Sequence, residues 1–294
     1  MNTIMEITPV THDLGQFEVR RTLPAKARRM VGPFIFVDQF GPAQLDIGHG
    51  MDVRPHPHIG LATVTWLFEG AIDHRDSLGN FATIHPGQVN LMTAGSGIVH
   101  SERSPQSERD AGAKLYGMQT WLALPDGREE IRPAFESRKD LPLFDDGGAC
   151  VRIIMGELWG ERAPTTTYAH TIYAEIDLCP LSVLPIEAEA EERAVMLVGG
   201  EAALDDEPLG LYVLTVLKPG AMMMLSSDRG GRLMLLGGEA FRTPRHAWWN
   251  FVSSSKDRIE QAKRDWAAGR FPKVPGDREE FIPLPDQPLT QTDG

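Results

Sequence analysis

The sequence predicts an all-β protein in which one β-domain occurs twice. Glycine and proline are frequent, with 29 and 22 copies in 294 residues, and they separate short runs rich in β-branched and aromatic residues. Helical patterns are scarce. Two stretches are alike, VTWLFEGAIDH at 64–74 and AVMLVGGEAALDD at 194–206. We therefore expect two closed or sandwich-like barrels, an arrangement that protects strand edges.

The repeat also sets the expected domain ranges. Each stretch is an apolar run, a glycine turn and a short return, and each is followed by Pro-Gly and a new apolar run, at 86–87 and at 219–220. The copies are about 130 residues apart, which is far longer than the period of a solenoid. We expect an N-terminal barrel over 1–140 and a C-terminal barrel over 141–294.

Two histidines stand at the entry of the first predicted strand, PHPHIGLATVTWLFEG at 55–70. In an extended chain, residues two apart point to the same face, so His56 and His58 project side by side. Pro57 between them cannot donate a ladder hydrogen bond, which indicates an edge or a strand entry.

A second pair with the same spacing follows in TAGSGIVHSER at 93–103, where His100 and Glu102 share a face. If the two strands are neighbours, the four side chains converge. Three imidazoles and one carboxylate suit a borderline divalent metal, and an octahedral ion would keep two positions for a substrate oxygen and for dioxygen or water. A structural zinc site is more often tetrahedral and cysteine-rich. We predict His56, His58, His100 and Glu102 as metal ligands.

Other histidines are left outside this site. His74 and His85 flank the first hairpin and have no second histidine two residues away. Either could line the mouth of the barrel, but we expect both at the surface. Applying the repeat offset to the predicted ligands gives positions near Ile186, Ala188, Leu233 and Leu235. None of these can bind a metal, so the second barrel is expected to be a scaffold.

One segment, SSKDRIEQAKRDWAAG at 254–269, has a helical pattern. Its apolar stripe includes Trp266, which is expected to dock the helix on a barrel. Ser254 is the expected N-cap, with Asp257 as its capping-box partner, and Gly269 is expected to end the helix.

Charge and composition exclude several classes of protein. The net charge of −12, from 41 acidic and 29 basic residues, opposes direct contact with nucleic acid. We find no apolar run of membrane-spanning length and no secretory signal. Cys150 and Cys179 are too few for a disulfide framework, so we expect buried, reduced thiols in a cytoplasmic protein, which we take as a monomer.

Four motifs, spread over almost the whole chain, match one known family. They are HPHIGLATVTWLFEG (56–70), HRDSLGN (74–80), PGQVNLMTAGSGIVHSE (86–102) and RHAWWNFVSSSKDRIEQAKRDWAAGRFPKVPGD (245–277). The chain resembles the pirins, within the cupin superfamily. The resemblance implies a bicupin: two facing β-barrels of the jelly-roll type with a short C-terminal helix, a metal-bearing N-terminal barrel and a degenerate C-terminal one. It implies iron held by His56, His58, His100 and Glu102, the four residues that the spacing also selects.

One departure from the family pattern concerns the pocket. Pirins commonly have Glu four residues after the second histidine, where this chain has Ala62. That Glu is not the family's carboxylate ligand, so metal binding should survive, whereas the sequence leaves the effect of Ala62 on the polarity of the pocket open. Trp66, Met92 and Trp121 are candidates for apolar pocket walls or for core packing.

The resemblance implies two kinds of function. Pirins look like quercetin 2,3-dioxygenases, which open a flavonol ring with dioxygen. The substrate here would be a small planar chelator such as a flavonol, and Glu102 would bind the metal and accept the substrate proton. Iron(II) is expected, with Ni, Mn, Co, Cu or Zn as substitutes. The alternative is a regulatory protein whose metal oxidation state is sensed by a protein partner in transcription or metabolism. A metal that only stabilises the fold is a third reading, and we favour the enzyme.

Overall fold

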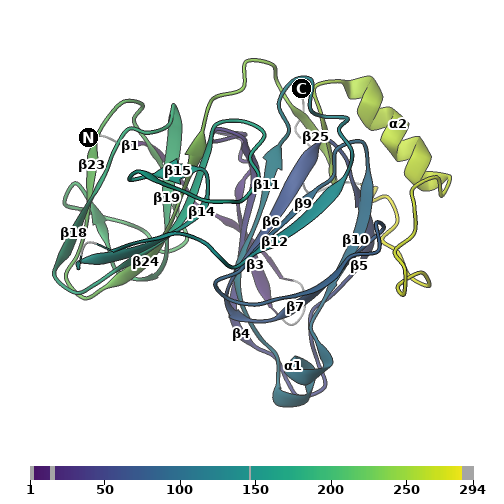
Figure 1. The fold of residues 1–294 in the computed structure, drawn as a ribbon, viewed down its shortest axis with the longest axis horizontal. Coiled ribbons are helices and arrows are strands. Elements are labelled where there is room, and N and C mark those ends of the chain that lie inside the picture. Colours follow the sequence, from purple (N-terminus) through teal and green to yellow (C-terminus); the bar gives the residue numbers. More distant parts are fainter. Residues whose placement is uncertain (1–2, 14–16, 146, 287–294) are drawn as a thin grey trace. The chain divides into compact units, whose positions relative to one another are not determined.

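The computed structural model describes residues 3–13, 17–145 and 147–286 and forms two compact units (Figure 1). Unit 1 comprises Met1–Thr11, Arg20–Phe36 and Asp140–Phe241, and unit 2 comprises His12–Val19, Val37–Lys139 and Arg242–Gly294. Both units consist almost entirely of strands, so the predicted all-β class is confirmed.

Neither unit is one continuous stretch, which the expected ranges 1–140 and 141–294 did not anticipate. At the N-terminus, β1 (Thr3–Ile7) pairs with β22 (Leu214–Leu217) and so joins unit 1. At the C-terminus, Phe251 packs on Ile59 in unit 2. A repeat pattern identifies similar segments along the chain, but it does not show which unit each terminal segment joins.

Unit 2 contains most of a seven-stranded sheet, in the order β12-β9-β6-β11-β4-β3-β2, and a four-stranded sheet, in the order β5-β10-β7-β8. The strands of the larger sheet are β2 (Val10–Asp13), β3 (Glu18–Leu23), β4 (Phe34–Gln44), β6 (Leu61–Gly70), β9 (Val89–Thr93), β11 (Lys114–Ala123) and β12 (Ala134–Arg138). Those of the smaller sheet are β5 (Asp52–His58), β7 (Ile72–Asp76), β8 (Phe81–Ile84) and β10 (Ile98–Arg103).

Unit 1 repeats this plan, with sheets in the orders β1-β22-β19-β24-β17-β14-β13 and β18-β23-β20-β21. Its further strands in the larger sheet are β13 (Leu143–Asp145), β14 (Ala149–Met155), β17 (Thr171–Leu178), β19 (Glu192–Gly200) and β24 (Gly231–Gly238). The smaller sheet has β18 (Ser182–Ile186), β20 (Ala203–Leu204), β21 (Glu207–Pro208) and β23 (Met223–Ser227). The antiparallel pair β5–β10 in the smaller sheet of unit 2 corresponds to the antiparallel pair β18–β23 in the smaller sheet of unit 1. The predicted duplication is therefore confirmed. Two short ribbons complete the strands, β15 (Glu157–Leu158) with β16 (Glu161–Arg162) and β25 (His246–Trp248) with β26 (Phe251–Ser253).

The interior of unit 1 is an aliphatic core that includes Leu235, Leu225 and Leu184, all buried. Truncating Leu235 to Ala should lower the free energy of unfolding by about 2–4 kcal/mol, because the lost methyl groups leave a cavity. Chemical denaturation measures this loss, and metal analysis of the folded variant should give wild-type content. A folded Leu235→Ala protein without metal would show that the ligands are assigned to the wrong unit.

The predicted C-terminal helix is present as α2 (Lys256–Ala267), but its N-cap is Ser255, whose hydroxyl accepts a hydrogen bond from Arg258 N at 3.4 Å. The expected cap, Ser254, instead donates its backbone N–H to Glu129. Trp266 docks as expected, because its indole Nε1 donates to the Ile282 carbonyl at 3.0 Å. The short helix α1 (Gln106–Ala111) was not predicted.

Both cysteines are free, but neither is buried as expected: Cys150 is half-buried and Cys179 is exposed. No helix in the described part of the chain is both long and apolar enough to cross a membrane.

Candidate metal centre

The strands β5 and β10 are hydrogen-bonded neighbours, as the convergence of the two residue pairs requires. In their antiparallel register His100 lies opposite His56, and Ile98 lies opposite His58. The register then shifts between His100 and Glu102, where β5 has one extra residue. On its other side β10 pairs with β7 without a shift, and there Glu102 lies opposite His74.

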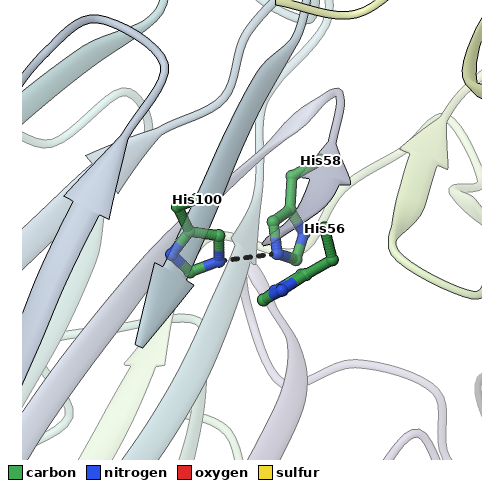
Figure 2. A group of neighbouring side chains, drawn as sticks. All are labelled: His56, His58 and His100. Atoms are coloured by element: carbon green, nitrogen blue, oxygen red, sulfur yellow. Dashed lines mark hydrogen bonds between the residues drawn. The ribbon is translucent and has the colours of Figure 1, made fainter. Parts of the chain in front are cut away.

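Three imidazoles meet in the interior of unit 2, with all their side chains directed toward one point (Figure 2). The Nε2 atoms of His58 and His100 are 3.1 Å apart, and the ring centroids of His56 and His100 are 4.4 Å apart. His56 Nδ1 lies 2.9 Å from the Arg54 carbonyl, so in the neutral ring Nδ1 donates and Nε2 keeps its lone pair.

Burial keeps these rings uncharged. Desolvation lowers the pKa of His56 to about 4 and lowers the pKa values of His58 and His100 well below the usual range, with the neighbouring histidines adding repulsion. Neutral imidazole is the form that binds metals. The cluster is therefore ready to bind a metal near neutral pH without first losing protons.

Acid should destabilise the metal-free protein through these rings. Because the pKa of His56 is about 4 in the folded chain and 6.5 for an unperturbed histidine, the unfolded chain binds more protons between these values. The free energy of unfolding should thus fall as the pH drops through this window, by roughly 3 kcal/mol for His56 alone. Denaturant unfolding of chelator-treated protein at several pH values tests this. An identical pH profile for His56→Asn would contradict it.

Glu102 is almost fully buried and lies close to His100 and His74, whereas His56 and His58 form their own group with His100. Desolvation raises the pKa of its carboxyl group, although the Thr65 hydroxyl, 3.4 Å from Oε1, acts in the opposite direction. A carboxylate with a raised pKa is a stronger base than an exposed one. Within unit 2 it is therefore suited both to binding a cation and to accepting a proton.

His74 was expected at the surface, but the structure buries it beside the cluster. It lies opposite Glu102 in the pairing of β7 with β10, and His74, His100 and Glu102 form a second group of candidate ligands that shares His100 with the first. Its Nε2 is 3.2 Å from Asp76 Oδ2. The missed signal was the alternation of Ile72, His74 and Asp76 with charged residues, which points all three to the interior. His85 is exposed, as predicted.

The larger sheet supplies walls to the cluster. Trp121 packs edge-on against His58 with centroids 5.0 Å apart, and Phe135 stacks on His74 at 4.4 Å. Met92 pairs directly with both Phe135 and Thr63, so it shares this inner face. Trp121 and Met92 were candidates for wall residues, although core packing was the favoured expectation for both, and sequence inspection missed Phe135.

Ala62 and Trp66 lie on the opposite face of β6. Thr65 reaches Glu102, so alternation directs Thr63 inward and directs Ala62, Val64 and Trp66 away from the cluster. Ala62 therefore does not line the cluster, which answers the question that the sequence left open, and Trp66 is a core residue, the role that core packing predicted.

The donor set fits a transition-metal ion. Two nitrogen ligands about 2.1 Å from one ion and at right angles to each other lie about 3.0 Å apart. The His58–His100 separation of 3.1 Å agrees with this value. Imidazole with carboxylate suits divalent iron, nickel, copper or zinc better than magnesium or calcium. The residues present therefore fit a single first-row metal.

Comparison with known proteins identifies the family. The family model described as Pirin matches residues 16–122, and the Pirin C-terminal cupin domain matches residues 173–272. A pirin-like protein of Caulobacter vibrioides is 48% identical over 279 residues, which cover 93% of this chain and 96% of that protein. The chain belongs to the pirin family.

Two further relatives carry an enzyme name. A Pseudomonas aeruginosa protein named "Putative quercetin 2,3-dioxygenase" is 38% identical over 92% of this pirin and 87% of its own length. The crystal structure of quercetin 2,3-dioxygenase from Acinetobacter baumannii matches with a TM-score of 0.91 and 34% identity, covering 98% of this chain and 96% of that one. The fold of this pirin is therefore that of a two-cupin protein.

The second cupin domain of this pirin has an apolar core where the first has its histidines. Pro57 pairs with Val99 in unit 2, and Pro185 pairs with Met224 in unit 1, which aligns the two strand pairs. The positions of His56, His58, His100 and Glu102 are then taken by Leu184, Ile186, Leu225 and Ser227. The offset used for the sequence mapping to Leu233 and Leu235 was wrong, because Pro86-Gly87 precedes β9 whereas Pro219-Gly220 precedes β23. The expected scaffold role of this unit agrees with its leucine-rich core.

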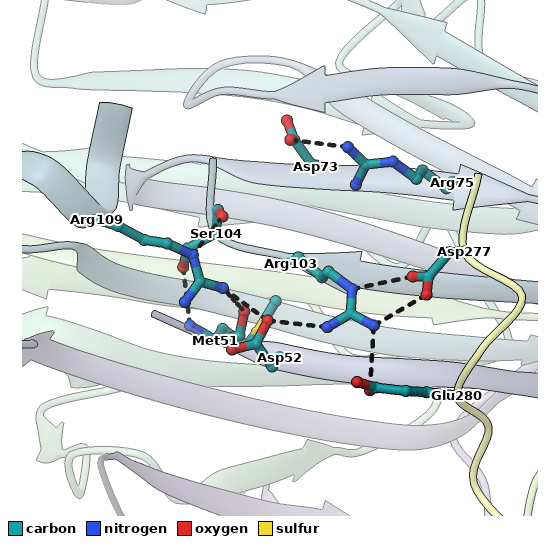
Figure 3. Close-up of polar contacts among 9 residues, drawn as sticks. All are labelled: Met51, Asp52, Asp73, Arg75, Arg103, Ser104, Arg109, Asp277 and Glu280. Atoms are coloured by element: carbon teal, nitrogen blue, oxygen red, sulfur yellow. Dashed lines mark hydrogen bonds and ion pairs between the residues drawn. The ribbon is translucent and has the colours of Figure 1, made fainter. Parts of the chain in front are cut away.

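An ion-pair network joins β5 and β10 to α1 and to the C-terminal segment (Figure 3). Arg103, next to Glu102, donates from Nε to Asp277 at 2.9 Å and from Nη1 to Asp52 at 3.1 Å. Arg109 also donates to Asp52, at 2.7 Å. These bonds tie the strands that bear the candidate ligands to α1 and to the C-terminal segment, which holds the ligand backbone in place.

Proposed function

We propose that this pirin is a mononuclear metal-dependent dioxygenase that opens the ring of a flavonol with dioxygen. His56, His58, His100 and Glu102 are the proposed ligands, and iron(II) is the proposed native metal. The observation that carries the proposal is the group of three neutral, buried imidazoles, His56, His58 and His100, with Glu102 grouped with His100 next to it and aromatic walls beside it. The names of the P. aeruginosa and A. baumannii relatives support this substrate class.

The metal, when bound, supplies a site where a chelating substrate and dioxygen are held next to each other. The imidazoles of His56, His58 and His100 hold it through ring nitrogens that carry no proton at neutral pH. Among the proposed ligands, His56 and Glu102 keep the largest exposed fractions, 7% and 9%. We therefore propose that a substrate approaches the centre from their side.

Glu102 accepts the proton of the substrate hydroxyl at a carboxylate oxygen. Burial raises the pKa of this group and so brings it closer to the working pH of a general base. The Thr65 hydroxyl near Oε1 orients the carboxylate. Trp121 and Phe135 offer aromatic faces and edges to a planar ring and keep bulk water from the reacting atoms.

Oxygen uptake tests the proposal. Protein loaded with iron(II) should consume dioxygen and quercetin in equal amounts, followed with an oxygen electrode and by the loss of flavonol absorption. Metal-free protein and free iron(II) are the controls. Uptake no faster than with free iron, across several flavonols, would overturn the enzyme assignment. A pull-down comparing the Fe(II) and Fe(III) forms would then test the regulatory alternative.

A further inference from the structure

One polar row crosses the inner face of the larger sheet of unit 2. Asn90 on β9 pairs directly with Thr65 on β6, and Thr65 pairs directly with Gln119 on β11. Cross-strand partners project to the same face, and Thr65 reaches Glu102 on that face. Asn90 therefore faces the interior that holds the candidate metal ligands.

The side chain of Asn90 is only 3% exposed, and neither its Nδ2 nor its Oδ1 has a hydrogen-bond partner within the described chain. Leaving a buried amide unpaired costs free energy, and such groups are rare unless a ligand or water completes them. The Thr65 hydroxyl is already engaged, because its single proton is shared between Gln119 Oε1 at 2.8 Å and Glu102 Oε1 at 3.4 Å. Asn90 is thus the member of the row with its full hydrogen-bonding capacity free.

We infer that Asn90 is a specificity-determining residue that binds a hydroxyl group of the substrate away from its metal-chelating oxygens. A carboxamide both donates and accepts, so it matches a phenolic hydroxyl, which does the same. The adjacent row, with Met92, Trp121 and Phe135, offers apolar contact to the ring that carries this hydroxyl. The favoured ligand is a polyhydroxylated planar aromatic. This inference rests on the proposed function.

A matched pair of substitutions separates ligand binding from folding. Asn90→Leu replaces the unpaired amide with an apolar group of similar size. Thr120 is also fully buried with an unpaired hydroxyl in the described chain, but it lies on the opposite face of the sheet from Gln119. Thr120→Val is therefore the control. Neither variant should lower the melting temperature, because each removes an unsatisfied buried polar atom.

The binding measurement uses zinc-loaded protein, which performs no redox chemistry, and follows the absorption shift of the bound flavonol. Quercetin is compared with 3-hydroxyflavone, which has the chelating oxygens but no other hydroxyl. Asn90→Leu should weaken quercetin binding about tenfold, the effect of one or two lost hydrogen bonds, and leave 3-hydroxyflavone binding and zinc content unchanged. Thr120→Val should leave both affinities unchanged.

Each outcome has a separate meaning. Unchanged quercetin affinity in Asn90→Leu would overturn the inference and leave the proposed function standing, with a bridging water as the partner of Asn90. Equal weakening for both ligands would also overturn it, since a general distortion of the site would then be the cause. If the wild-type protein binds neither flavonol, the flavonol assignment fails, and the role of Asn90 fails with it.

Discussion

His100→Ala should remove most of the bound metal. His100 belongs to both groups of candidate ligands, and its Nε2 lies 3.1 Å from that of His58. Removing partners that only support a metal ligand already costs about 10–100-fold in affinity, so loss of a ligand itself should cost more. Elemental analysis of purified protein, and titration of the metal-free form, measure the change. The wild type should hold about one equivalent of a first-row metal.

The control for this experiment is His85→Ala. His85 is an exposed histidine of the same unit and should not affect metal content. His56→Ala should behave like His100→Ala, and circular dichroism should show that each variant is folded. Full metal occupancy in the His56→Ala, His100→Ala double variant would rule out the assignment.

Glu102→Gln should lower turnover per bound metal by about 10²–10⁴-fold. Gln keeps an oxygen that can coordinate, so metal content should fall much less than activity. It cannot accept a proton near neutral pH, whereas burial raises the pKa of the Glu102 carboxyl and strengthens it as a base. Oxygen uptake with a saturating flavonol, normalised to metal, gives the comparison.

A second variant tests whether the Thr65 hydroxyl lowers the pKa of the Glu102 carboxyl group. Thr65→Val removes the hydroxyl that lies 3.4 Å from Glu102 Oε1 and that lowers the carboxyl pKa. The acidic limb of the rate profile should therefore move to higher pH in Thr65→Val. Wild-type turnover in Glu102→Gln would remove the proposed base role.

The alternation of side chains between the two faces of a strand accounts for much of what the sequence predicted correctly. It indicated the strand that forms β6 and the shared faces of His56 with His58 and of His100 with Glu102. These are period-two properties of an extended chain, which the sequence displays directly. The duplicated β-domain was indicated separately, by two similar stretches that are each followed by Pro-Gly.

The missed features depend on which strands pair. His74 joins the cluster because β7 is hydrogen-bonded to β10, and Phe135 reaches His74 from β12. Likewise, β1 and the C-terminal segment belong to units that lie far from them in the sequence. A single sequence indicates the faces of a strand but not its neighbours, so long-range register had to come from the structure.

The ligand set itself is tested most directly by a crystal structure of the iron-loaded protein with anomalous scattering measured at the iron edge. The account predicts one strong peak per chain, within bonding distance of His56, His58, His100 and Glu102, and no peak among Leu184, Ile186 and Leu225 of unit 1. A peak bound by His74, His100 and Glu102 without His56 and His58, or a peak elsewhere in the molecule, would contradict the assignment.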